Sequence, residues 1–433
     1  MDISSDNLDN AVITVPPTAI EPTIEPVIEP VNESTNKQIN EESLSIVTKP
    51  KTKKSVSFCV PLKSDVSRNQ NNIQLVKPSH NSNINLKTIS NRIEYTKYIL
   101  KIIKLDPVID FNNNNQFFID IPITKINIKH VFIKSNFGIK YYKNKYGYAF
   151  KARSKIDKNI LFDISICTCP KYSAALQISK LLGNFIINRS TPSIAIPISS
   201  FYTKINDLYS WWPFETIDIR PHDDKKNGTA LVYISEWCDC SLLELVTNSY
   251  FIIPKNFWDV IIFQILFTLD RIQIKYPTFR HNDLSISNIF VYTDKVVNSS
   301  KTYYNYIVGN KSFVVPNIGV QVRIKNFTHA CIGSIVENSS INDLPELHIS
   351  SNENKYYDIN YFLNTLLLKS QKNNFQIPKE IDEFMYRVVP DKYCVGGKYC
   401  SMAGRLVVDD EYTTPYKILL TDPLFNKFGS MKN

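Results

Sequence analysis

One short turn constrains this chain more than any other stretch of its sequence. It lies within Phe279 to Val291, where His281, Asp283 and Asn288 follow one another at intervals of two and five residues. The preceding run, Phe257 to Ile274, is apolar on most faces and is expected to be a buried helix. The residues after the turn are β-branched and aromatic, as in a short strand. A turn held between two buried elements can direct a carboxylate and an amide oxygen into one cleft, as a general base beside a metal ligand requires.

The composition allows a large folded body around this turn. The chain has 433 residues, of which 43% are hydrophobic and 12% aromatic, so it has room for two lobes and is not wholly disordered. Its formal charge of +9 comes from dispersed lysines, which predicts no specific nucleic-acid partner. No run approaches the roughly 20 apolar residues of a membrane helix, and Met1 to Asp6 carries no secretory leader. We expect a soluble intracellular protein that is not secreted and has reduced thiols.

Residues 1 to 85 are predicted to be a disordered tail. The triplet Ile-Glu-Pro recurs at 20–22, 24–26 and 28–30, and proline at this density prevents both helices and central strands. The basic patch between Lys49 and Lys54 is interpreted as part of a solvated linker.

Residues 86 to 128 are predicted to be an extension that precedes the main body. Apolar residues recur at helical spacing from Leu86 to Ile103, so we expect a helix that ends before Pro107. Alternating apolar segments at 117–123 and 126–133 are expected to be strands.

Four other segments, together with the turn, give the chain a resemblance to a known family. They are a strand that ends in Glu236 to Cys238, the strand Val322 to Phe327, an apolar helix that begins near Asp358, and the terminal run Thr414 to Phe425. With these, about residues 130 to 428 resemble the divergent protein-kinase-like proteins of large DNA viruses such as the mimivirus group. The resemblance implies an α+β fold with a small β-rich lobe at 129–235 and a larger helical lobe at 236–433. It also implies serine/threonine phosphoryl transfer from ATP with Mg²⁺.

The resemblance assigns the catalytic roles to residues of the turn and of one later strand. Asp283 matches the catalytic base, and His281 belongs to the same motif. Asn288 and Asn326 match the two metal ligands. Asp358 is placed to hold the backbone of the catalytic loop from below.

The resemblance also implies a nucleotide site. Backbone groups of Glu236 and Cys238 would meet the adenine ring at the hinge between the lobes. A hairpin containing Gly138 and Gly147 would lie over the phosphates, although it is poor in glycine compared with the family.

Several positions depart from the family pattern, and most of them concern the clamp on phosphates and metal. Ser165 stands where a phosphate-binding lysine is expected, and the following helix offers Gln177 but no glutamate. Lys151, on the neighbouring strand, is the candidate replacement for the lysine. Asn326 replaces an aspartate, and losing a formal charge near the metal is expected to cost several kcal/mol of transition-state stabilisation. Asn282 replaces the arginine that usually binds a phosphorylated activation segment.

These departures favour a pseudokinase or a weakly active serine/threonine kinase, located in the host cytoplasm or the virion. It would act on a protein substrate or bind a protein partner. Two alternatives remain open. The intact pair Asp283 and Asn288 supports an active atypical kinase. The sequence His-Asn-Asp-Leu also occurs in choline-kinase-like small-molecule phosphotransferases, against which the terminal run Thr414 to Phe425 argues.

Overall fold

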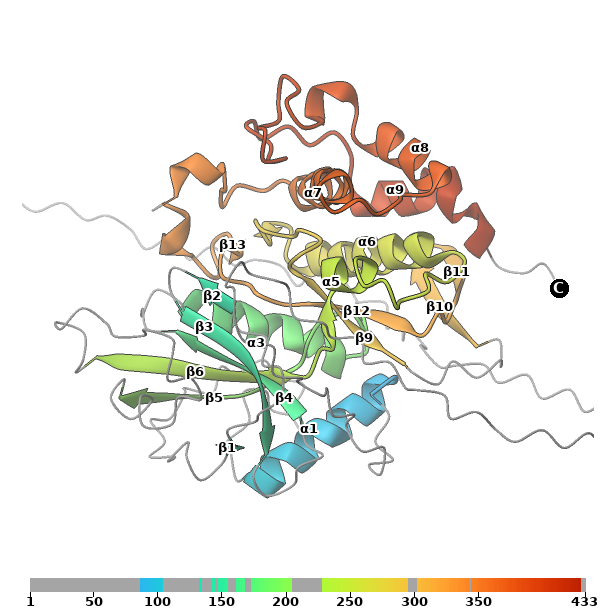
Figure 1. The fold of residues 1–433 in the computed structure, drawn as a ribbon. Coiled ribbons are helices and arrows are strands. Elements are labelled where there is room, and N and C mark those ends of the chain that lie inside the picture. The colour runs from blue at the N-terminus through green and yellow to red at the C-terminus, as the bar shows by residue number, and fades with distance from the viewer. Residues whose placement is uncertain are drawn as a thin grey trace, which may run out of the picture.

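The computed structural model describes residues 86–103, 161–167, 173–204, 228–294, 302–342 and 344–429, together with the backbone of strands at 132–133, 142–144 and 147–154. The predicted tail, Gly138 and the strand expected at 117–123 lie outside these residues. The described chain combines helices and strands (Figure 1), so the predicted α+β class is confirmed.

One antiparallel sheet forms the β-rich part of the molecule. Its strands are β1 (Phe132–Ile133), β2 (Tyr142–Asn144), β3 (Gly147–Ser154), β4 (Leu161–Cys167), β5 (Pro197–Lys204) and β6 (Thr229–Glu236). They run in the order β1-β3-β4-β6-β5, with β2 paired to β3. The helix α3 (Ser173–Ile187) follows β4 and carries Gln177. Figure 1 shows α3 crossing between the sheet and the helical part.

The helical part is built around α6, as the apolar run in the sequence predicted. Its helices are α5 (Leu242–Val246), α6 (Phe257–Lys275), α7 (Tyr357–Asn373), α8 (Lys379–Val388) and α9 (Pro415–Thr421). Figure 1 shows α7, α8 and α9 on one side of α6. Phe263 of α6 contacts the rings of Phe425 and Phe428, each with ring centroids 5.6 Å apart. The end of the chain is therefore part of the hydrophobic core.

Short strands on the other side of α6 carry the turn from His281 to Asn288, which is the predicted catalytic loop. The sheet β12-β9-β7 joins β7 (Cys240–Ser241), β9 (Ile289–Thr293) and β12 (Val320–Ile324). A second pair joins β8 (Phe279–Arg280) to β13 (Cys331–Ile332). A hairpin with Gly309-Asn310 at its turn joins β10 (Tyr303–Val308) to β11 (Lys311–Pro316).

Two helix starts also follow the sequence. Ser241 forms a capping box with Glu244 at the start of α5. At the start of α9, the Thr414 hydroxyl accepts from the Lys417 amide at 3.2 Å, and Pro415 occupies the first turn.

The helix α1 (Ile89–Ile103) confirms the predicted helix, but its buried side is not purely apolar. Arg92 is 1% exposed, and its guanidinium donates to both carboxylate oxygens of Glu236 at 2.7 Å. It also donates to the carbonyl oxygens of Pro192 and Ile194, each at 2.5 Å. A buried arginine with this many acceptors ties α1 to the end of β6 and to the segment before β5.

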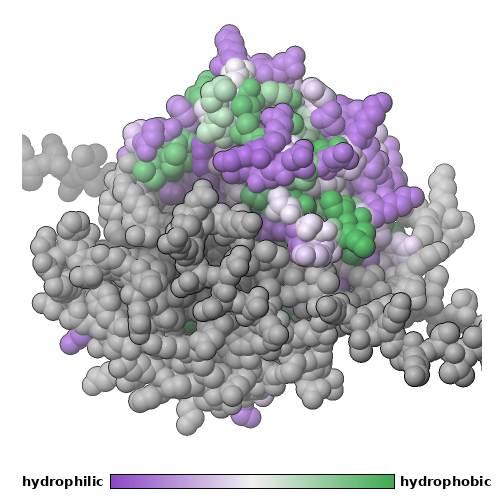
Figure 2. Space-filling view, in the orientation of Figure 1, coloured by the Kyte–Doolittle hydropathy of each residue, from purple (hydrophilic) through white to green (hydrophobic). Residues whose placement is uncertain are grey.

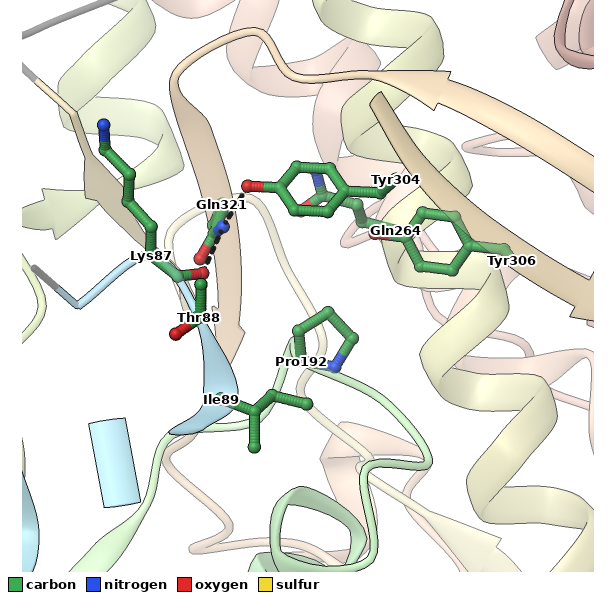
Figure 3. A pocket seen from close by; sticks show the side chains of 8 residues that line it. All are labelled: Lys87, Thr88, Ile89, Pro192, Gln264, Tyr304, Tyr306 and Gln321. Carbon is green, nitrogen blue, oxygen red and sulfur yellow. Dashed lines mark hydrogen bonds between the residues drawn. The ribbon is translucent and has the colours of Figure 1, made fainter. Parts of the chain in front are cut away.

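The residues just before α1 anchor the same helix to the other part of the molecule. Figure 3 shows Gln321 of β12 donating to the Lys87 carbonyl and to the Tyr304 hydroxyl, both at 2.8 Å. The Lys87 ammonium also forms an ion pair with Asp294. Residues 86–103 are therefore an integral part of the described fold.

The visible surface of the helical part interleaves polar and apolar residues (Figure 2). Among the described helices, none combines the length and apolar character needed to cross a membrane.

Candidate active site

Asp283, Asn288 and Asn326 meet in one hydrogen-bonded chain. The Asn288 side-chain amide donates to the Asp283 carboxylate at 2.5 Å and to the Asp283 carbonyl at 3.0 Å. The Asn326 amide then donates to Asn288 Oδ1 at 3.3 Å. The pairing of Ile289 with Ile324 brings the two asparagines together, since each lies within two residues of that pair. The predicted base and both predicted metal ligands therefore share one site.

Asp358 of α7 holds the catalytic loop, as predicted. Its carboxylate accepts from the backbone amides of His281 at 2.7 Å and Asn282 at 2.9 Å. The side chain is 1% exposed, and burial raises its pKa above the ordinary value despite these donors and the nearby His281 and Arg280.

His281 supports the site from inside the protein. It is fully buried, its Nε2 lies 3.2 Å from the Lys325 carbonyl oxygen, and its ring centroid is 5.3 Å from that of Phe327. A side chain with no exposed surface does not reach a substrate. His281 is therefore a positioning residue that joins the catalytic loop to the strand carrying Asn326.

Asn282 ties the catalytic loop directly to the following segment. Its amide nitrogen donates to the carbonyl oxygens of His329 at 3.0 Å and Ser350 at 2.9 Å. Its φ is 61°, a left-handed conformation that asparagine adopts more readily than most residues. The segment that follows Asn326 to Thr328 corresponds to the activation segment of kinases. Here the neutral amide of Asn282 holds it, whereas the family uses an arginine that binds a phosphorylated residue.

Replacing Asn282 by Ala is expected to loosen this segment. The substitution removes the side-chain amide that makes both hydrogen bonds, and alanine tolerates the left-handed conformation less well than asparagine does, so we expect a loss of about 2–3 kcal/mol of stability. Amide hydrogen exchange in 344–355 should speed up more than in α6. Asn282→Gly keeps the backbone conformation but loses the donors, so it should show the exchange effect with a smaller loss of stability. Unchanged exchange in both variants would refute the anchoring role.

Arg405, to which no sequence motif assigned a role, binds the predicted base directly. Its guanidinium donates to Asp283 Oδ1 at 2.6 Å and to the carbonyl of Asn282. The guanidinium also lies 4.0 Å from the ring centroid of Tyr361. The Tyr361 hydroxyl also donates to Asp283 Oδ1, at 3.3 Å. Gly404, with φ of 81°, turns the chain just before Arg405. No sequence pattern links Asp283 and Arg405, because they lie 122 residues apart.

The predicted phosphate clamp is only partly within the described residues. Ser165 lies on β4, the strand before α3, and pairs in register with Ala149 and Tyr233. Gly147 starts β3 and closes the β2–β3 hairpin. Lys151 stands opposite Asp163 in the pairing of β3 with β4, and its side chain lies outside the described residues. The roles of these residues stay predictions.

A second contact missed by the sequence analysis lies two residues from Ser165. The Lys325 ammonium donates to Asp163 Oδ2 at 2.5 Å and lies 4.5 Å from the ring centroid of Phe290. Burial alone would lower the pKa of Lys325, but the Asp163 carboxylate raises it above the ordinary value. The ammonium therefore stays charged. A signal was present in the sequence, because Asp163 and Ser165 are two apart on one strand and thus share a face.

The predicted hinge residues are buried, and the Glu236 side chain has a structural partner. Its carboxylate binds Arg92 and lies 3.7 Å from Arg323. Burial alone would raise the pKa of Glu236, yet the two arginines lower it below the ordinary value. Its amide donates to the Ile196 carbonyl at 2.9 Å, and the Cys238 thiol donates to the Glu236 carbonyl at 3.8 Å. Adenine recognition by the backbone at these positions stays a prediction.

The fold and the site together are those of a protein-kinase-like protein. No protein-family model matches the chain. It is 36% identical over 378 residues to the mimivirus protein named "Putative serine/threonine-protein kinase R400" from Acanthamoeba polyphaga mimivirus, covering 79% of this chain and 81% of that protein. It is 39% identical over 85 residues to "Putative serine/threonine-protein kinase R301" of the same virus, covering 19% and 21%. The chain therefore belongs to this family of mimivirus serine/threonine-kinase-like proteins, as the resemblance predicted.

Proposed function

We propose that this protein is a degenerate serine/threonine kinase in which Asp283 sustains weak phosphoryl transfer. The observation that carries the proposal is the hydrogen-bonded chain of Asp283, Asn288 and Asn326. It keeps a base beside two candidate metal ligands, while Ser165 and Gln177 supply neither the lysine nor the glutamate of the usual phosphate clamp.

ATP and Mg²⁺ are the cofactors that fit this site, with weakened affinity. The two candidate ligands beside Asp283 are neutral amides, whereas Mg²⁺ favours carboxylate oxygens. The Oδ1 of Asn288 also accepts a hydrogen bond from Asn326, so a metal ion would have to replace that bond. Bound Mg²⁺ would neutralise charge that develops on the transferred phosphoryl group.

The nucleotide would extend from this metal site towards the hinge. Backbone groups of Glu236 and Cys238 are the candidates for the adenine ring, and Gly138, Gly147 and Lys151 are the candidates for the phosphates. The acceptor is proposed to be a serine or threonine hydroxyl of a protein, in line with the names of the two relatives. The place of action is proposed to be the infected host cytoplasm or the virion.

The role of Asp283 is tested by autophosphorylation with labelled ATP and either Mg²⁺ or Mn²⁺. Slow incorporation is expected for the native chain, and Asp283→Ala should abolish it because the hydroxyl proton loses its acceptor. Glu383→Ala is the matched control, since this carboxylate is 56% exposed on α8 and should leave the rate unchanged. Equal incorporation by the native chain and Asp283→Ala would refute the proposal.

A scaffold without turnover is the second candidate function. Two contacts favour it. Asn288 Oδ1 already accepts a hydrogen bond from Asn326, and the Asp283 carboxylate already accepts one from Arg405. If the native chain incorporates no phosphate with either Mg²⁺ or Mn²⁺, the scaffold function is the better candidate.

A choline-kinase-like activity is the remaining alternative. The confirmed α9 start at Thr414-Pro415 and the terminal core around Phe425 match the protein-kinase pattern instead. Phosphorylation of choline by the native chain would select this alternative over transfer to protein.

A further inference from the structure

The Lys325–Asp163 ion pair lies at the hinge end of the predicted nucleotide site. Asp163 stands opposite Ser235 in the pairing of β4 with β6, one residue before Glu236. Ser165 stands opposite Tyr233, farther from the hinge. The pair therefore lies nearer the adenine end than the phosphate end of the site.

The two residues come from opposite sides of that site. Asp163 belongs to β4 of the β-rich part, whereas Lys325 follows β12 directly. Phe290 of β9 lies beneath the ammonium, and its half-buried position alternates with the buried Ile289 and Val291. The ammonium of Lys325 therefore contacts both the Asp163 carboxylate of the sheet and the Phe290 ring of β9.

The Lys325 ammonium lies over the ring of Phe290, on the surface where a flat ligand would stack. An aromatic ring needs about 3.5–4.0 Å of separation from each surface that it contacts. The ammonium lies 2.5 Å from the Asp163 carboxylate and 4.5 Å from the Phe290 ring centroid. A flat nucleobase stacked on Phe290 would therefore need the volume that the ammonium fills.

The pair also has an incomplete hydrogen-bonding pattern. Within the part of the chain that the structure describes, the buried Asp163 Oδ1 has no hydrogen-bond partner. Such an acceptor weakens the pair relative to a fully satisfied one. A contact of this kind can open when a competing ligand binds.

We infer that Lys325 and Asp163 close the nucleobase subsite, so that a purine nucleotide binds only after this ion pair separates. The inference rests on the proposed function, because it concerns the same nucleotide site. It predicts weak nucleotide binding for a reason that is independent of the neutral metal ligands. When the nucleobase enters, the hydrogen bond between Lys325 and Asp163 breaks and the purine ring stacks on Phe290.

The test compares the affinity of the full chain for Mg·ATP before and after removal of the pair. Fluorescence titration with a ribose-labelled ATP, competed by unlabelled ATP, gives the Kd. Asp163→Ala combined with Lys325→Ala leaves no unpaired charge and should bind at least tenfold more tightly. The nearly isosteric Asp163→Asn should show a smaller gain in affinity for Mg·ATP. This single variant replaces the double variant in the test if the double variant folds poorly. Thermal melting without nucleotide monitors folding in each case.

Arg387→Ala is the matched control, because this arginine forms a bidentate pair with Asp422 in the helical part, remote from the sheet. Its affinity for Mg·ATP should equal that of the native chain. Weaker binding by the double variant would overturn the inference and make Lys325 a nucleotide ligand. Equal binding, or no binding by either chain, would also overturn it. The autophosphorylation test with Asp283→Ala judges the proposed function separately, since it depends on transfer rather than on this affinity.

Discussion

Asn326→Asp is expected to raise the rate of autophosphorylation about 100-fold, which corresponds to about 2.7 kcal/mol of transition-state stabilisation. The substitution exchanges a neutral oxygen for a carboxylate beside Asn288, at 3.3 Å in the present structure. Mg²⁺ gains a charged ligand, and the hydrogen bond that Asn326 donates to Asn288 Oδ1 is removed. Both changes favour the metal.

The backbone admits this change at little cost. Asn326 has φ of 69°, and aspartate also tolerates the left-handed conformation. The measurement is the initial rate of phosphate incorporation as Mg²⁺ is varied, and the required Mg²⁺ concentration should fall. Asn326→Ala is the control, because it loses the amide without adding charge and should lower the rate. A rate unchanged by aspartate would show that this position does not bind the metal.

Arg92→Ala is expected to destabilise the protein by about 3–5 kcal/mol. The substitution leaves the buried Glu236 carboxylate without its two closest donors and leaves the carbonyl oxygens of Pro192 and Ile194 without a shared partner. Arg323 lies 3.7 Å from Glu236 and still neutralises part of its charge when Arg92 is removed. We therefore expect the loss of stability to lie near the lower end of that range.

Equilibrium unfolding in urea measures this loss, with Lys97→Ala as the control on the same helix. The Lys97 side chain is 41% exposed and pairs with the exposed Glu94 three residues earlier, so its loss should change stability by no more than about 0.5 kcal/mol. Combining Arg92→Ala with Glu236→Gln should recover part of the stability by removing the buried charge. Equal stabilities for Arg92→Ala and Lys97→Ala would contradict the bracing role of α1.

Much of the fold could be predicted because its signals are local. The apolar run of α6, the cap at Ser241, the turn at Gly309-Asn310 and the Thr414-Pro415 start of α9 each depend on neighbouring residues. Propensity, capping and turn geometry act over a few residues, so they can be predicted without knowledge of the rest of the molecule.

The catalytic turn was predictable for the same reason. Asp283 and Asn288 are five residues apart, and their hydrogen bond spans only the turn itself. The role of Asp358 followed from the family resemblance, and the structure confirmed both of its bonds to the loop.

The sequence by itself determined the strands and helices that carry the site, the base and asparagine held by one turn, and the missing lysine and glutamate of the clamp. The tertiary structure alone decided which distant charges meet. Arg405 reaches Asp283, Lys325 reaches Asp163 and Arg92 reaches Glu236 across separations of 122, 162 and 144 residues. The physical reason is that a buried charge requires a partner but does not specify where in the chain that partner lies. Only the packing of the sheet, α1 and the helices brings each pair within reach.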